Sequence, residues 1–116
     1  MNKEIQEFKE HIEKIINLNI LVIVEGKKDM AALNKFGITN IIELTKGPLY
    51  KIVEEVADTN KECIILTDLD KKGKELYGKL NSDLQKRGVK VDNNLRNFLF
   101  KNTKIRQIEG INNVVE

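Results

Sequence analysis

Short aliphatic runs alternate with amphipathic stretches along the chain. Uninterrupted runs at residues 20–24 and 63–67 are typical of strands that are covered on both faces of a parallel sheet. The expected strands are 20–24, 40–44, 63–67 and 89–91, with a last one at 104–108. Apolar positions spaced three and four apart predict helices at 3–17, 27–36, from Pro48 onward, at 73–87 and from Asp92 through 99. This alternation predicts an α/β fold, a three-layer α/β/α sandwich around a mostly parallel, Rossmann-like sheet of about four strands.

Length and composition favour one folded domain spanning residues 1–116. The chain has 116 residues, of which 41% are hydrophobic, enough for one core. Its apolar runs are far shorter than the roughly 20 residues of a membrane span, and the N-terminus has no signal-peptide pattern. Cys63 is the single cysteine, which excludes an internal disulfide and a multi-cysteine metal site. We therefore expect a cytoplasmic protein without membrane contact.

The small net charge of +2 hides an uneven distribution. Residues 1–70 carry 9 basic and 13 acidic side chains, a balance of −4, whereas residues 71–106 carry 11 basic and 3 acidic ones, a balance of +8. Such asymmetry favours an anionic partner, although a lysine-rich solvated surface would give the same count. We expect such a partner, a nucleic acid above all, to contact the basic stretch, especially Lys86, Arg87, Lys90, Arg96, Lys101, Lys104 and Arg106.

Three acidic residues follow the expected strands. Glu25 comes directly after the first, and Asp68 and Asp70 come after the third. If these strands are neighbours, about 4.8 Å apart, the carboxylates converge at one sheet edge although 68 − 25 = 43 positions separate the nearest two. Clustered carboxylates need cations or raised pKa values to coexist, and a set of oxygen ligands suits Mg²⁺, with Mn²⁺ as the alternative ion. Acids in surface turns are the competing interpretation.

Glycines and lysines surround the same turns. Gly26 and Gly73 lack a Cβ, so the backbone can turn sharply and an anion can approach the helix that follows. Four lysines flank the acidic turns and could contact phosphate oxygens, with solvated surface lysines as the alternative. They are Lys27, Lys28, Lys71 and Lys72.

These motifs together resemble the toprim domain. The resemblance rests on the VIVEGKKD segment at 22–29, the TKG segment at 45–47 and the DLDKKG segment at 68–73. The pattern is most similar to the toprim domain of ribonuclease M5 and to small stand-alone archaeal toprim proteins. It covers a core of about residues 20–91 and leaves the helix at 3–17 and a C-terminal extension at 92–116 outside.

The resemblance implies roles for individual residues. Glu25 would act as a general acid or base and as a metal ligand, and Asp68 and Asp70 would hold Mg²⁺, so all three are candidate catalytic residues. Four further residues would shape the turns or support the ligands. They are Gly26, Asp29, Gly47 and Gly73. A carboxylate in the first turn of a helix also stabilises that helix, which is the alternative role for Asp29.

The expected function is metal-dependent processing of nucleic-acid phosphodiesters, as by a small nuclease acting on RNA or structured nucleic acid. The alternative is a non-catalytic toprim module that binds nucleic acid, DNA or RNA, or assembles with a larger protein partner. The apolar tail at 111–115 is compatible with a homodimer, and equally with a short helix folded onto a monomer.

Overall fold

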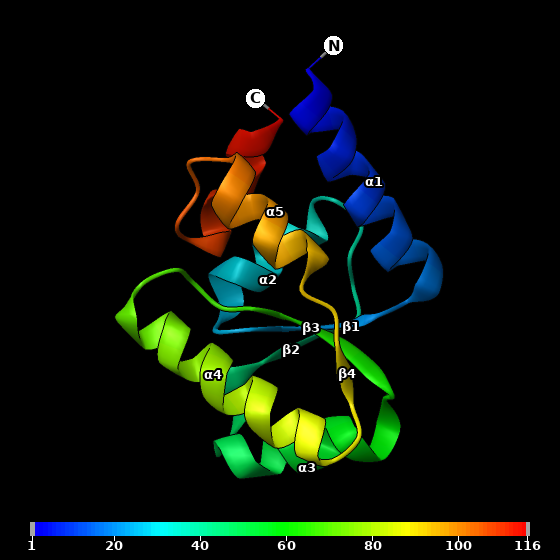
Figure 1. Cartoon of the computed structure of the whole chain (residues 1–116), viewed down its shortest axis with the longest axis vertical. Helices are drawn as coiled ribbons and strands as arrows, with labels where there is room; N and C mark the ends of the chain where they lie inside the picture. The colour runs from blue at the N-terminus through cyan, green and yellow to red at the C-terminus, as the bar shows by residue number, and fades with distance from the viewer. Residues whose placement is uncertain (1, 116) are drawn as a thin grey trace.

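A parallel sheet with the strand order β2-β1-β3-β4 forms the centre of the computed structural model, which describes residues 2–115 (Figure 1). The strands are β1 (Leu21–Val24), β2 (Ile41–Glu43), β3 (Glu62–Leu66) and β4 (Lys90–Val91). In the register of this sheet, Val24 lies beside Leu66 on one side and beside Glu43 on the other. After β1 the chain forms β2 on one side of it and then crosses over to form β3 and β4 on the other side. The direction of the strand order therefore switches between β1 and β3.

Helices cover both faces of the sheet, which confirms the predicted three-layer α/β/α sandwich. The α-helices are α1 (Lys3–Leu18), α2 (Lys27–Asn34), α3 (Leu49–Thr59), α4 (Lys71–Lys86) and α5 (Asn94–Asn102), and the 3₁₀ helices are η1 (Leu44–Lys46) and η2 (Ile108–Val114). Figure 1 shows α3 and α4 on one side of the sheet and α1, α2 and α5 on the other.

Side chains that alternate along the strands divide the core in two. Val24 and Leu66 point into a cluster with residues of α1, α2, α5 and η2, whereas Ile23 and Ile65 point into a cluster with α3 and α4. All four side chains are 0% exposed. Burial on both faces explains why the strands are continuous aliphatic runs without polar positions.

The C-terminal segment differs from the sequence prediction, because no strand forms at 104–108. Residues 103–107 are a loop, and η2 follows and packs against α2. Val115, at the end of the tail that was considered for a homodimer contact, is 36% exposed, whereas Ile108 and Ile111 are both 0% exposed and covered within the chain. Their spacing of three matches the three residues per turn of a 3₁₀ helix, which brings both to the core.

Among the described residues, no helix has the length and apolar character needed to cross a membrane.

Candidate functional site

The ends of β1 and β3 meet where the sequence predicts them to meet. Glu25 and Asp68 follow these two adjacent strands, and the Asp68 backbone N–H donates to Oε2 of Glu25 at 2.8 Å. Oδ1 of Asp68 in turn accepts from the backbone N–H of Ile108 at 2.8 Å. Both acidic side chains are half-buried. The site therefore lies at the carboxyl edge of the sheet, at the switch in strand order, where open α/β sheets bind ligands.

Two further aspartates fix the helices that begin at this edge. Oδ1 of Asp70 accepts from the Gly73 backbone N–H at 2.7 Å and caps α4. Oδ2 of Asp29, in the first turn of α2, accepts from the Gly26 backbone N–H at 3.2 Å. Such bonds satisfy backbone donors that have no partner inside the helix or its entry turn. Asp70 is exposed, whereas Asp29 is buried.

Gly73 is required for packing, which corrects the expectation that it opens a path for an anion. A Cβ added at Gly73 would overlap the carbonyl group of Asp68, because the first turn of α4 lies directly on that backbone. By contrast, a Cβ at Gly26 or Gly47 would meet no atom within 4 Å. Of the two glycines next to the acidic turns, Gly26 and Gly73, Gly26 therefore leaves open space at its Cβ position and Gly73 does not.

Arg96 lies beneath the site, and the expectation that it contacts nucleic acid is wrong. Its side chain is only 6% exposed, and Nη1 donates to the carbonyl oxygen of Thr67 at 2.6 Å and to its Oγ1 at 3.2 Å. The guanidinium stacks on the rings of Tyr77, at 4.5 Å, and Phe100, at 5.0 Å. Oγ1 of Thr67 also donates to the Gly73 carbonyl at 2.7 Å. Arg96 thus supports the turn between β3 and α4 from within the core.

Negative charge is concentrated at this edge. Burial, followed by the charge of Asp68, raises the pKa of Asp29 from 3.8 to about 6, and Glu25 contributes in the same direction. The hydrogen bond from Gly26 opposes this rise only in part. Burial lowers the pKa of Arg96, while Asp68 and Glu25 act against that decrease. A cation at the edge would offset the repulsion among the carboxylates.

The four predicted phosphate-contacting lysines are all exposed. Lys27 and Lys28 begin α2, and Lys71 and Lys72 begin α4, on both sides of the carboxylates. None of the four forms a salt bridge within residues 2–115. Cations in the first turn of a helix are opposed by its dipole, so these positions do not favour helix stability.

Sequence reasoning missed Glu43, which ends β2 beside β1. Its side chain is 4% exposed, and its Oε1 is buried without a hydrogen-bond partner among the described residues. Oε2 lies 3.7 Å from Nζ of Lys46. The available signal was an acidic residue inside the short aliphatic strand expected at 40–44, next to its end.

The carboxylates fit Mg²⁺ by their chemistry. Glu25, Asp68 and Asp70 each use one oxygen for a backbone N–H, and the second oxygen of each has no hydrogen bond or salt bridge within residues 2–115. Free carboxylate oxygens are the ligands that Mg²⁺ prefers, with water completing its shell. In the described part of the chain, however, no three His, Cys, Asp or Glu side chains already form a group that could hold a metal ion. The three-residue ligand set therefore stays a prediction.

Comparisons with known proteins agree with the geometry. The family model described as "Toprim domain" matches residues 19–93. A UPF0292 protein of Methanocaldococcus jannaschii is 37% identical over 94 residues, covering 78% of this chain and 73% of that protein. A second UPF0292 protein, from Pyrococcus abyssi, is 40% identical over 105 residues, covering 90% and 78%. Both relatives are archaeal, consistent with the predicted resemblance to small archaeal toprim proteins.

A solved structure also matches. The structure of a putative protein from Aquifex aeolicus has a TM-score of 0.81 and 33% sequence identity, and the match covers 93% of this chain and 98% of that one.

We predict that Gly73→Ala is strongly destabilising. The added methyl group must displace the Asp68 backbone, so the free energy of unfolding should fall by about 2–3 kcal/mol or more in urea denaturation. Gly78→Ala is the control in the same helix, because a Cβ there meets nothing within 4 Å. It should increase the free energy of unfolding by about 0.5–1 kcal/mol. Equal effects at both positions would contradict the packing role of Gly73.

Replacing Arg96 should also destabilise the fold. Arg96→Met keeps an apolar stem but removes the hydrogen bonds to Thr67 and the stacked charge, so we expect a loss of about 2–4 kcal/mol. Arg87→Met, at the exposed end of α4, should change the free energy of unfolding by less than about 0.5 kcal/mol. Similar unfolding midpoints for wild type and Arg96→Met would show that Arg96 has no supporting role.

The raised pKa of Asp29 predicts a pH-dependent stability. A folded-state pKa of about 6 against 3.8 means that the folded protein holds the proton more tightly, so stability falls as pH rises from about 4 to 6. Above that range the buried charge costs up to about 3 kcal/mol. In metal-free buffer, Asp29→Asn should therefore be more stable than wild type by about 1–2 kcal/mol at pH 7 and should lose this advantage at pH 4.

Asp58→Asn serves as the control, because Asp58 is exposed on α3. Chemical denaturation of the three proteins at both pH values gives the comparison. An Asp29→Asn advantage that does not change with pH would argue against the raised pKa.

Proposed function

The chain belongs to the toprim domain family, and from this premise we propose that it is a small metal-dependent nuclease acting on RNA or structured nucleic acid. Toprim membership indicates a metal-binding function related to nucleic acids. The main support for the nuclease proposal is the hydrogen bond between Glu25 and the Asp68 backbone, at the point where the strand order of the sheet switches. It holds two acidic residues from distant parts of the sequence at the edge where such sheets bind ligands.

The carboxylates have distinct proposed roles. Asp68 and Asp70 would hold Mg²⁺, or Mn²⁺, through the oxygens that are not bonded to the backbone. When bound, the ion would lower the pKa of water and neutralise charge on the phosphate. Glu25 would complete the ligand set or accept a proton at Oε1, because Oε2 is already used by the Asp68 N–H.

Substrate binding would use the exposed lysines at the two helix starts. Lys27, Lys28, Lys71 and Lys72 have no salt bridge within residues 2–115 and lie on both sides of the carboxylates. The helix dipole does not favour lysines at these positions, whereas a polyanion would. Open space in front of Gly26 would let a phosphate approach Glu25.

One observation favours the alternative of a non-catalytic module that binds nucleic acid. The described residues contain no preformed group of three metal-ligating side chains, and each candidate carboxylate already has a structural hydrogen bond. In this alternative, the carboxylates would serve the fold, and the lysines alone would bind nucleic acid, with a larger protein partner supplying any chemistry.

Amide variants of the carboxylates test the nuclease proposal. Glu25→Gln, Asp68→Asn and Asp70→Asn each keep an oxygen that can accept the same backbone N–H, so the fold should be retained. We expect cleavage of labelled RNA and DNA substrates in Mg²⁺ or Mn²⁺ to decrease by about 100-fold or more in each variant. Alanine variants are less suitable, because Asp68→Ala would also release Ile108.

Two controls make the result specific. Glu54→Gln, on the exposed side of α3, should cleave like wild type, and calorimetric titration with Mn²⁺ should detect binding to wild type and much weaker binding to Asp68→Asn. Equal cleavage by wild type and all three amide variants would attribute the activity to a contaminant or another site. Salt-dependent binding without cleavage of any substrate would favour the module instead.

A further inference from the structure

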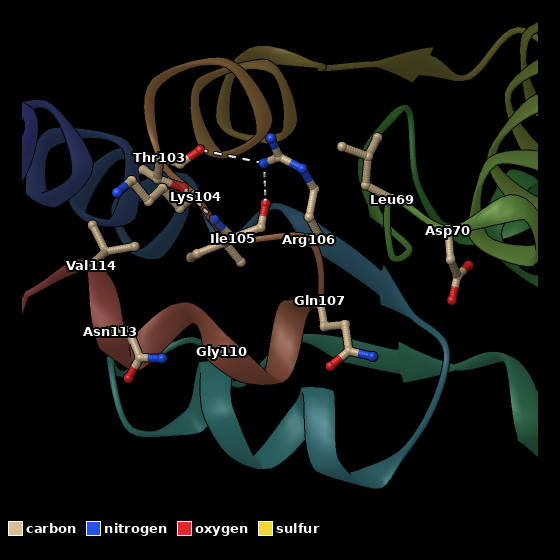
Figure 2. Close-up of a pocket in the computed structure, with 10 residues that line it drawn as sticks. All are labelled: Leu69, Asp70, Thr103, Lys104, Ile105, Arg106, Gln107, Gly110, Asn113 and Val114. Atoms are coloured by element: carbon tan, nitrogen blue, oxygen red, sulfur yellow. Dashed lines mark hydrogen bonds between the residues drawn. The ribbon is translucent and has the colours of Figure 1, made fainter.

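A pocket of about 490 Å³ lies beside the carboxylate edge, and most of its lining residues come from the C-terminal segment that follows the part of the chain matching the toprim model (Figure 2). One wall comes from Leu69 and Asp70, in the turn between β3 and α4. The other walls come from the loop at residues 103–107 and from η2. This volume suits one small ligand, since such sites typically measure about 300–1,000 Å³.

Hydrogen bonds tie the pocket to the candidate site. The Leu69 backbone N–H donates to the Arg106 carbonyl oxygen at 2.8 Å, and Oδ1 of Asp68 accepts from the Ile108 N–H at 2.8 Å. Asp70 belongs to both the pocket lining and the predicted metal ligands. An occupant of the pocket would therefore lie next to whatever binds at the carboxylates.

The lining favours an anion with a flat, partly polar body. Lys104 and Arg106 are exposed basic residues, against one acidic residue, Asp70. Figure 2 shows the Arg106 guanidinium bonded to two carbonyl oxygens of its own loop, those of Thr103 and Ile105, which hold it at the pocket. Both bonds use Nη1, so the N–H groups on the other two nitrogens of the guanidinium remain available for a phosphate.

The remaining lining combines apolar surface with amides. Leu69, Ile105 and Val114 supply aliphatic surface on which a base could lie, and Gln107 and Asn113 supply both donors and acceptors for its edge. A base stacked inside a duplex cannot enter a pocket of this size, so the nucleotide must be unpaired or extruded.

We propose that this pocket, formed by the turn after β3 and the C-terminal segment, holds one unpaired nucleotide of a nucleic-acid strand, next to the phosphodiester at Glu25 and Asp68. The inference rests on the proposed function and specifies its substrate, a strand with an unpaired nucleotide beside the reacting bond. Lys104 and Arg106 could bind the phosphate of a free nucleotide as well as that of a strand, and the competition experiment below distinguishes the two.

Filling the pocket gives the direct test. A Cβ at Gly110 would have Asn113 Nδ2 and Ile105 Cγ2 as its nearest atoms, each 3.9 Å away, so a larger side chain there enters the pocket without a clash at Cβ. In EDTA, binding of a fluorescent single-stranded ten-nucleotide RNA or DNA should weaken at least about tenfold in Gly110→Leu. Gly78→Leu, which adds the same side chain to an exposed position of α4, should bind like wild type.

Removing the basic side chains of the pocket is a second, independent test. Lys104→Ala and Arg106→Ala should each weaken binding and reduce the salt slope by about one, whereas Arg87→Ala should do so less. Because the Arg106 backbone carbonyl remains, the bond to Leu69 is kept in Arg106→Ala. Thermal melts identify any variant that has lost the fold, and the two charge variants then decide the result if Gly110→Leu has unfolded.

The competitors decide what the pocket accepts. A blunt duplex and free nucleoside monophosphates should both compete much less well than the single strand. Equal binding by wild type and Gly110→Leu, or equal competition by the duplex, would overturn the inference. Competition by a monophosphate at the same concentration as the strand would also overturn it, in favour of a free nucleotide.

The outcome separates this inference from the nuclease proposal. If wild type and Gly110→Leu cleave and bind equally, the pocket inference fails while the proposed nuclease stands. If the single strand binds through the pocket but no protein cleaves it, the pocket inference stands and the nuclease proposal fails.

Discussion

The close contact between α4 and the end of β3 is the constraint on which the site depends. Only a glycine fits at position 73, because the first turn of the helix lies on the Asp68 backbone. This contact brings the Gly73 N–H to Asp70 and the Gly73 carbonyl to the Thr67 hydroxyl. With the turn held in this way, the Asp68 N–H points to Glu25 across the sheet. Main-chain donors therefore orient the carboxylates before any ligand binds.

The centre of the fold could be predicted from the sequence because it depends on local patterns. Continuous aliphatic runs at 20–24 and 63–67 indicate buried parallel strands, and parallel strands end at a common edge. The adjacency of Glu25 and Asp68 followed once β1 and β3 were neighbours. The role of Asp70 as the cap of α4 could not be predicted in the same way, because side-chain directions depend on contacts that the sequence does not display. The binding of a metal by all three carboxylates stays a prediction.

The C-terminal third was harder to predict because its structure depends on distant partners. The segment at 104–108 has a composition compatible with a strand, but the bond from Ile108 to Asp68 and the burial of Ile111 place it in a loop and a 3₁₀ helix. Arg96 belongs to a stretch with a balance of +8, which gives no sign that this one cation is inside. Its burial requires Tyr77 and Phe100, from two different helices, to enclose the guanidinium. The exposed basic surface is therefore smaller than the charge count suggests.

Asp68 connects the carboxylate edge with the C-terminal segment that lines the pocket. One of its oxygens holds the C-terminal segment through Ile108, and the other has no partner within residues 2–115 and faces no competing salt bridge there. A carboxylate that moves toward a ligand must carry Ile108 with it or lose that hydrogen bond, and Ile108 directly follows the loop that lines the pocket. A bond from a backbone amide to a charged group contributes about 1.5–3 kcal/mol, comparable with the coupling energies that link separate sites in proteins. The hydrogen bond from Ile108 to Asp68 thus links the carboxylate edge to the segment that lines the pocket.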